Sequence, residues 1–228
     1  MQNFKTKLVF SLIIVFLGSG FALQAQEYSF GLKGGMNYSV DKNSAEIVEL
    51  PTGIIEYVEP GVGFQGGVFF ELSFNKFFVR PEVVYSTSSG QFNFPSSFKY
   101  TINKISVPLL LGYNIWGPLD IYAGPAYQNI LSNKLENYNG PLESLQGSLA
   151  GQLGIKYAYK KIEIDLRYDF TLDSSKNQAL RIPSLAATPP NVPNALMDDG
   201  RLNRLLLSLS FKLFDSENPG KSKTSCYF

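Results

Sequence analysis

Residues 162–170 read IEIDLRYDF, so every even-numbered residue is apolar and every odd-numbered residue is charged. Successive side chains of a β-strand point to opposite faces of the sheet. The segment therefore predicts a strand with one apolar face and one ionic face. Such a strand fits a soluble sheet as well as a membrane barrel, so the number of strands and their connections must decide between the two.

Seven further segments of the chain alternate between apolar and polar residues with the same period of two. Each candidate is long enough to cross a bilayer, since a tilted transmembrane strand needs about 9–11 residues. We place the eight strands near 27–39, 61–73, 77–90, 100–115, 119–131, 146–159, 161–172 and 202–214.

The joints between these strands alternate in length. An even strand count, with short turns at one end and long loops at the other, is typical of outer-membrane barrels. The sequence thus predicts an all-β fold, an eight-stranded antiparallel up-and-down transmembrane β-barrel whose long loops face outward from the cell. The short joints lie at 74–76, 116–118 and 159–160, and the long ones cover about 40–60, 91–99, 132–145 and 173–201.

Sorting the strands by face gives one apolar surface for lipid and one charged surface for the lumen. An eight-stranded barrel is only wide enough inside for its own side chains, so we expect the charges to pair across the lumen and close it. The lipid face includes Leu32, Val68, Val83, Leu109, Leu153 and Leu207. The lumen network comprises Lys33, Glu71, Arg80, Glu82, Lys104, Asp120, Lys156, Glu163, Asp165, Arg167, Asp169, Arg204 and Lys212.

A soluble, lipocalin-like barrel is the structural alternative, because it also has about eight antiparallel strands. Its interior would be apolar and its exterior polar, and a shift of one residue in register exchanges the two faces. Two features favour a membrane barrel over a soluble one. An ionic interior is costly for a soluble ligand-binding barrel. Aromatic girdles mark the two edges of a membrane barrel, and Tyr113, Trp116, Tyr122 and Tyr127 gather near predicted strand ends.

The first 25 residues have the pattern of a secretory signal peptide: Lys5 and Lys7, an apolar run over 8–21, and small residues before a cleavage site. We expect cleavage after Ala25, with Ala22 as the alternative, which would change the formal charge from +1 to −1. With a net charge this close to zero, the sequence shows no excess of basic residues of the kind that binds nucleic acid. The expected organisation is signal peptide 1–25, barrel 26–214 and periplasmic tail 215–228.

Three short motifs follow one another along the predicted strands: GLKGGMNYS at 31–39, ISVPLLLGY at 105–113 and YAGPAY at 122–127. In this order, and behind a signal peptide, they resemble the PorT-like outer-membrane β-barrel family. The resemblance covers residues 26–214 and implies an outer-membrane barrel of a Gram-negative bacterium. Some relatives are linked to protein export or to larger envelope assemblies, and the family offers no catalytic residues to carry over. The tail after residue 214 departs from the family, whose barrels commonly stop at the last strand.

The composition argues against an enzyme. The chain has no histidine and a single cysteine, Cys226, so a Ser-His-Asp arrangement and an intramolecular disulfide are both excluded. Glu163, Asp165 and Asp169 share one strand face and could in principle do acid–base work. Because Arg167 stands among them, we interpret them as part of a neutralised lumen network. No cofactor and no metal are expected.

Two long loops hold the remaining candidates. Residues 46–58 predict a strand, a turn and a strand, and the apolar residues of this segment are interspersed with acids. They either pack on one another or form an exposed patch with an acidic rim that binds a partner. Loop 173–201 is proline-containing and is either functional or disordered. The candidate partner-binding residues are Ile47, Val48, Leu50, Ile54, Ile55 and Tyr57.

The leading functional hypothesis is a non-enzymatic, closed barrel in the bacterial outer membrane. It would contact outer-membrane lipid and anchor or assist an envelope or protein-export assembly through loops 40–60 and 173–201, with envelope or secretion proteins as partners and no nucleic acid. The alternative is a narrow, porin-like transport channel in which the lumen charges line a water path. A histidine-free envelope enzyme is a third possibility.

Overall fold

The computed structural model describes residues 27–40, 45–50, 52–93, 97–136, 138, 142–143, 148–172, 177–182, 193–198 and 203–216. The predicted signal peptide and the tail beyond residue 216 lie outside these ranges. Within them, no helix is long and apolar enough to span a membrane.

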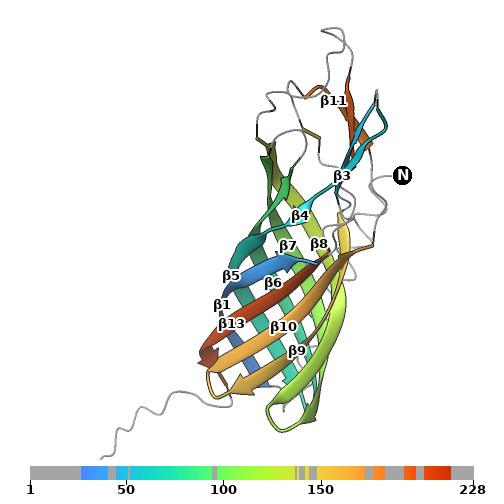
Figure 1. Ribbon diagram of the computed structural model, residues 1–228. Helices are drawn as coiled ribbons and strands as arrows, with labels where there is room; N and C mark the ends of the chain where they lie inside the picture. The colour runs from blue at the N-terminus through green and yellow to red at the C-terminus, as the bar shows by residue number, and fades with distance from the viewer. Residues whose placement is uncertain are drawn as a thin grey trace, which may run out of the picture.

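Eight long antiparallel strands close into one barrel (Figure 1). Around the ring their order is β6-β5-β1-β13-β10-β9-β8-β7, and pairing of β6 with β7 completes the circle. Closure satisfies the backbone groups that an open edge would expose to lipid. The strands are β1 (Glu27–Ser39), β5 (Val62–Phe74), β6 (Phe77–Phe92), β7 (Phe98–Trp116), β8 (Leu119–Leu135), β9 (Leu149–Tyr159), β10 (Ile162–Thr171) and β13 (Arg204–Asp215).

The predicted fold class is confirmed, and the strands lie within a few residues of their predicted places. One joint differs: β6 and β7 remain paired out to Phe92 and Phe98, so both ends of the predicted long loop at 91–99 belong to the paired strands. The pairing extends because Phe92 and Phe98 stack on each other and are buried inside the outer end of the sheet.

The two faces of the barrel are assigned as the sequence predicted. The outward residues are apolar and exposed along every strand, for example Leu32 at 51%, Leu111 at 59% and Leu207 at 53%. The interior is lined by charged and polar side chains, which contradicts the lipocalin-like alternative. Trp116, 81% exposed, lies next to the short turn at 117–118, as expected of an interfacial aromatic residue. Tyr122 does not belong to this girdle, because it faces the lumen and is buried.

Four glycines sit opposite aromatic residues of the neighbouring strand, three on the interior face and one, Gly151, on the outward face. The cross-strand pairs are Gly31 with Phe69, Gly112 with Phe78, Gly154 with Tyr122 and Gly151 with Phe170. In each pair the ring lies where a Cβ of the glycine would be; at Gly112 such a Cβ would lie 2.0 Å from Cζ of Phe78. Gly31, Gly112 and Gly154 therefore make room for rings in the narrow lumen, whereas Gly151 makes room for Phe170 on the outward face.

A β-bulge interrupts the last strand. Phe214 pairs with Phe30 and Lys212 pairs with Gly31, so Leu213 is the extra residue on β13. A bulge shifts the in–out alternation of the residues beyond it. Asp215 consequently faces the interior, opposite Ser29, and is buried.

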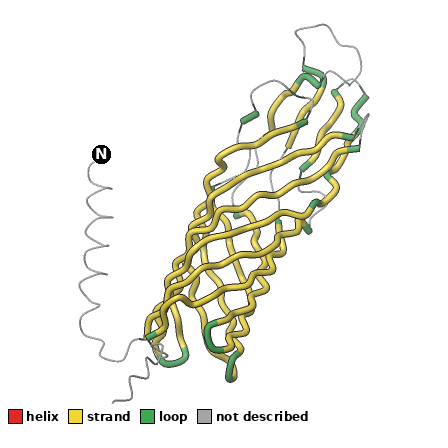
Figure 2. Tube along the Cα trace, turned by 90° about the vertical axis from the view of Figure 1, so that its left-hand side faces the viewer, coloured by secondary structure: helices red, strands yellow, loops and turns green. Residues whose placement is uncertain are grey.

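A second sheet lies beyond the outer end of the barrel (Figures 1 and 2). It has four antiparallel strands in the order β11-β12-β2-β3, and we call it the cap sheet. The strand–turn–strand predicted at 46–58 is confirmed as the β2–β3 hairpin, and it joins two strands of loop 173–201. The cap strands are β2 (Glu46–Glu49), β3 (Ile55–Tyr57), β11 (Asn177–Leu180) and β12 (Ala195–Asp198), while β4 (Glu59–Pro60) pairs with the outer end of β6.

An apolar cluster joins the cap sheet to the barrel. Strands β6, β7 and β8 are longer than the other barrel strands and form a tall wall at the outer end. One face of the cap sheet packs against this wall. The lumen is therefore lined by charged side chains toward the short turns and by apolar side chains at the outer end. The buried residues of the cluster are Ala45, Ile47, Val58, Phe92, Phe98, Tyr100, Ile102, Leu135, Leu180, Ile182, Ala195 and Met197.

Gly112→Ala tests the glycine–aromatic packing. The new methyl group would displace the buried ring of Phe78, which packs with Leu110 and Tyr122, so we expect a loss of about 1–3 kcal/mol in the free energy of unfolding. Urea unfolding in lipid vesicles measures the change. The matched control is Gly34→Ala, whose Cβ would lie no nearer than 3.9 Å to its closest neighbour. Equal stability of the two variants would contradict the packing argument.

Leu207→Arg tests the direction of the faces. Leu207 lies among the outward leucines of β13 and pairs with outward Met36 and Leu166. An arginine near the middle of the lipid band should cost about 2–4 kcal/mol. Leu207→Met serves as the control, because it keeps the volume and the apolar character. If Leu207→Arg left the unfolding free energy and the heat-modifiable gel migration unchanged, the lipid-facing assignment would be wrong.

Candidate functional site

The structure brings all thirteen sequence-predicted lumen charges into the barrel interior. Twelve of them are buried, and Lys212 is partly buried. Each takes part in at least one ion pair. Their strands place them there because the in–out alternation is preserved through the ionic zone.

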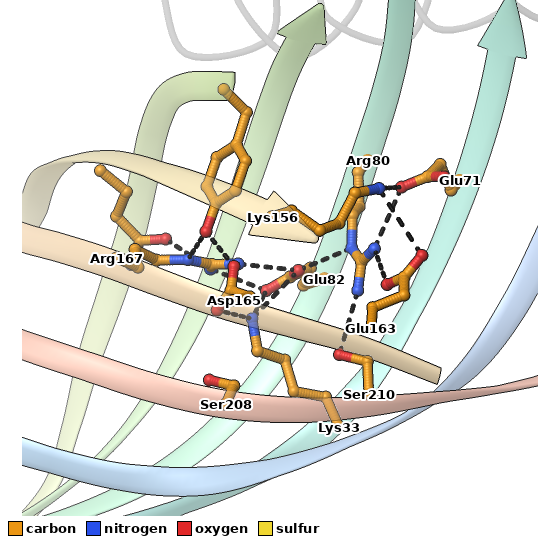
Figure 3. A network of polar contacts seen from close by, with 12 residues as sticks. Lys33, Glu71, Arg80, Glu82, Lys156, Glu163, Asp165, Arg167, Ser208 and Ser210 are labelled. Carbon is orange, nitrogen blue, oxygen red and sulfur yellow. Dashed lines mark hydrogen bonds and ion pairs between the residues drawn. The ribbon is translucent and has the colours of Figure 1, made fainter. Parts of the chain in front are cut away.

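Arg80 is the centre of the network (Figure 3). Its Nη1 lies 3.0 Å from Glu71 and 2.6 Å from Glu163, while its Nε lies 2.9 Å from Glu82. Glu71 comes from β5 and Glu163 from β10, so one guanidinium connects opposite walls of the barrel. The planar guanidinium can serve several carboxylates at once, which a lysine ammonium does with less geometric control.

Arg167 and Lys33 form a second centre around Glu82 and Asp165. Arg167 lies 2.8 Å from Glu82 and 3.1 Å from Asp165, and Lys33 lies 3.2 Å from Glu82 and 3.3 Å from Asp165. The hydroxyl of Tyr122 donates to Asp165 and accepts from Nε of Arg167. Glu82 is thus shared by three cations, since Arg80 also contacts it.

Lys156 extends the network toward the short turns. Its ammonium lies 2.6 Å from Glu71, 3.4 Å from Asp120 and 3.6 Å from Glu163. Lys212 follows at 3.7 Å from Glu163.

Asp169 organises the outer part of the ionic zone. It pairs with Arg204, lies 3.7 Å from Lys104 and accepts hydrogen bonds from Gln128 at 3.0 Å and Gln152 at 3.3 Å. Gln152 also accepts from Arg167 at 2.9 Å, which links this group to the second centre. Charged and amide side chains therefore form one connected system across the lumen.

Asp215 is a lumen residue that the sequence analysis missed. Its carboxylate lies 3.6 Å from Lys212, and with it the interior holds seven acidic and seven basic side chains. The tail predicted from the sequence begins at residue 215, but β13 extends to Asp215, and the bulge at Leu213 turns its side chain inward. Regular alternation would have pointed Asp215 outward, so its position in the lumen could be predicted only by knowing that a bulge precedes it.

Three of the cations also stack on the interior rings that cover the glycines. Arg80 lies 3.7 Å from the ring centroid of Phe69, Lys156 lies 4.1 Å from that of Phe78, and Arg167 lies 5.0 Å from that of Tyr122. Each stack runs from a glycine through a ring to a cation. Such contacts hold a buried cation in place while its other side meets carboxylates.

This arrangement favours structural neutralisation over chemistry. Glu163, Asp165 and Asp169 each lie against at least one cation, so none is held as a poised acid or base. In the part of the chain that the structure describes, no group of three or more potential ligand residues could hold a metal ion.

The six candidate partner-binding residues separate into two groups. Ile47 is only 4% exposed and packs in the apolar cluster, so it is not available to a partner and that prediction is wrong for this residue. Val48 is half-buried on the opposite face of the cap sheet. Exposed side chains are presented by Leu50, Ile54, Ile55 and Tyr57.

Comparison with known proteins gives one family and several similar structures. Residues 24–177, more than half of the chain, match the family model described as outer membrane protein beta-barrel domain. The outer membrane protein OprG from Pseudomonas aeruginosa has 18% identity and a TM-score of 0.53, covering 82% of this chain and 96% of its own. The attachment invasion locus protein Ail of Yersinia pestis, solved with the heparin analogue sucrose octasulfate, has 13% identity and a TM-score of 0.45, covering 83% and 99%. Among curated proteins no match was found.

Glu82→Gln tests the lumen network. Glutamine keeps the shape but removes the charge shared by Lys33, Arg80 and Arg167, so three cations lose a buried carboxylate. Breaking a buried ion pair from one side typically costs about 3–5 kcal/mol. Asp215→Asn is the comparison, and it should cost less because its partner Lys212 retains 13% side-chain exposure. Guanidinium unfolding in detergent micelles measures both, and an equal or smaller loss for Glu82→Gln would contradict the network's central position.

Proposed function

The chain belongs to the outer membrane protein beta-barrel domain family, and from this premise we propose that it is a closed, non-enzymatic barrel that anchors or assists an envelope assembly through its outer end. Its place is the bacterial outer membrane. We extend the proposal to the PorT-like branch and to protein-export assemblies on the three motifs quoted above. Cleavage of the signal peptide after Ala25 belongs to the same proposal.

The observation that carries the proposal is the balance of the lumen. Seven acids and seven bases face one another inside an eight-stranded barrel, with ion-pair distances down to 2.6 Å. Side chains fill a barrel of this size, and a water path needs space that they occupy. Arg80 and Arg167, both buried, cross the middle of the lumen.

The cap sheet supports the same proposal from the outer end. Its inner face packs into the apolar cluster with Phe92, Phe98 and Tyr100, above the ionic zone. A solute entering from outside would meet this apolar packing before it reached the charges. The competing proposal is a narrow transport channel. It requires both the apolar cluster at the outer end and the ionic zone of the lumen to open.

An anchoring role requires an outer surface that contacts other proteins. The cap sheet provides one, because it stands beyond the lipid-facing strands and carries exposed apolar residues. Contiguous exposed apolar patches, especially those rimmed by polar residues, mark interaction sites. The enzymatic alternative lacks a comparable basis, since the chain has no histidine and the lumen carboxylates are neutralised.

Lysine-reactive cross-linking in intact outer membranes, followed by mass spectrometry, tests this proposal. Lys99 and Lys134 are exposed near the outer end, whereas Lys76 and Lys160 lie at the short turns and act as an internal control. We expect a reproducible envelope protein joined through the outer lysines. If the folded, abundant barrel gave no such partner, or gave partners only through the turn lysines, anchoring through the outer end would be refuted.

A further inference from the structure

The lipid-facing surface of the barrel is hollowed beside the short turn that joins β5 to β6. The hollow lies over β6, β7 and β8 and has a volume of about 440 Å³, and we call it the turn groove. Its outward side chains are Phe77, Leu111, Tyr113, Ile121 and Ala123, all of them exposed. The turn groove therefore opens toward lipid and not toward the lumen.

One small residue leaves the space that the turn groove occupies. The strand register places Tyr113 between Phe77 and Ile121, in a row of large side chains next to the turns. In the next outward row, farther from the turns, the residue of β8 opposite Leu111 is Ala123. A methyl group covers little of its neighbour, and Leu111 is 59% exposed. The turn groove is thus open at Ala123 and bordered by large apolar side chains.

Aromatic residues mark the end of the turn groove that lies nearest the short turns. The rings of Phe77 and Tyr113 meet edge to face, with their centroids 5.0 Å apart. Trp116, in the adjoining turn region, is 81% exposed. Tyrosine and tryptophan concentrate where the hydrocarbon of a bilayer meets its headgroups. The turn groove consequently begins at headgroup level and runs into the hydrocarbon.

A lysine stands at this end of the turn groove. Lys76 directly precedes Phe77 and is exposed. Its carbonyl oxygen accepts a hydrogen bond of 2.7 Å from the amide of Asn114, the residue after Tyr113, so the turn is attached to β7 at the border of the groove. A cation at headgroup level attracts anionic lipid.

No exposed acid offsets the charge of Lys76 in this part of the barrel. The turn at 73–77 and the adjoining strand ends at 113–122 contain one acid, Asp120. Asp120 faces the lumen, where it lies 3.4 Å from Lys156 and accepts a hydrogen bond of 2.7 Å from Asn114. The ammonium of a zwitterionic headgroup would therefore find no carboxylate here, whereas a phosphate would find Lys76.

We infer that the turn groove binds one acyl chain of an anionic phospholipid whose phosphate lies against the ammonium of Lys76. The lipid belongs to the leaflet at the short turns, so this site is independent of the proposed anchoring through the outer end. A protein partner is disfavoured, because the groove opens into the lipid band. A free phosphate ion would leave the apolar groove unfilled.

Fluorescence quenching by brominated lipid tests the inference. Trp116 is the only tryptophan, and it lies beside the turn groove. The barrel is folded into vesicles of equal parts phosphatidylglycerol and phosphatidylethanolamine, with bromine on the acyl chains of one lipid or of the other. We expect stronger quenching by brominated phosphatidylglycerol, corresponding to about fivefold enrichment beside the protein, and a smaller difference at high salt. Equal quenching by the two labels, or stronger quenching by phosphatidylethanolamine, would overturn the inference.

Two pairs of variants locate the site. Lys76→Gln removes the cation and Ala123→Phe fills the groove, and each should abolish the preference for phosphatidylglycerol. The control Lys160→Gln removes another exposed turn lysine, which stacks on Tyr159 at 5.3 Å outside the turn groove. Both controls should keep the preference, as should Val83→Phe, which fills a second lipid-facing groove of about 490 Å³.

The outcomes for these variants are decisive because all four altered side chains are exposed, so each barrel should fold; heat-modifiable gel migration checks this. Retention of the preference by either test variant, or its loss in either control, would refute the assigned site. Inorganic phosphate added at constant ionic strength should leave the quenching unchanged. If it removed the preference, the ligand would be a free anion and the inference would be wrong.

Discussion

A barrel of eight strands leaves an interior that side chains must fill, and in this protein most of that filling is charged. Charges removed from water are tolerated only when they are paired and hydrogen-bonded. Arg80, Arg167 and Lys156 meet that requirement by reaching carboxylates on other strands. Such a network does not by itself guarantee stability, because desolvation opposes the attraction. Its stronger effect is on register: a slip of one residue would turn a strand's charges toward lipid.

The rest of the architecture follows from where this ionic zone ends. Toward the outside, the wall of β6, β7 and β8 continues beyond the other strands and its inner face becomes apolar. An apolar face outside the membrane must be covered, and the cap sheet covers it with Ile47, Ala195 and Met197. The same cover leaves the sheet's other face exposed, and the proposed interaction surface lies there. The proposed closure of the lumen and the proposed outer surface would therefore both follow from one change in side-chain character along the wall.

Sequence periodicity was sufficient for the barrel and insufficient for the cap. Strands of ten or more residues repeat their in–out pattern often enough to define both faces, as residues 162–170 illustrate. The cap strands have only three or four residues, which is too short for a repeating in–out pattern. In addition, β2 pairs with β12 across about 150 residues of chain, so no local sequence pattern predicts their pairing. For this reason the sequence left open whether Ile47 packs on its neighbours or binds a partner, and the structure buries it. Asp215 was hidden by a bulge, whereas Tyr122 shares its parity with inward Asp120 and could have been placed in the lumen.

The closed lumen is the claim on which the account depends, and single-barrel conductance in planar bilayers tests it most directly. The balanced, paired network predicts an electrically silent wild-type barrel, with no stable unitary current across a range of voltages. Insertion must be verified independently, for example by recovery of folded protein from the same membranes. Steady unitary openings of the verified, folded wild-type protein would contradict the account and identify the charged lumen as a conducting path.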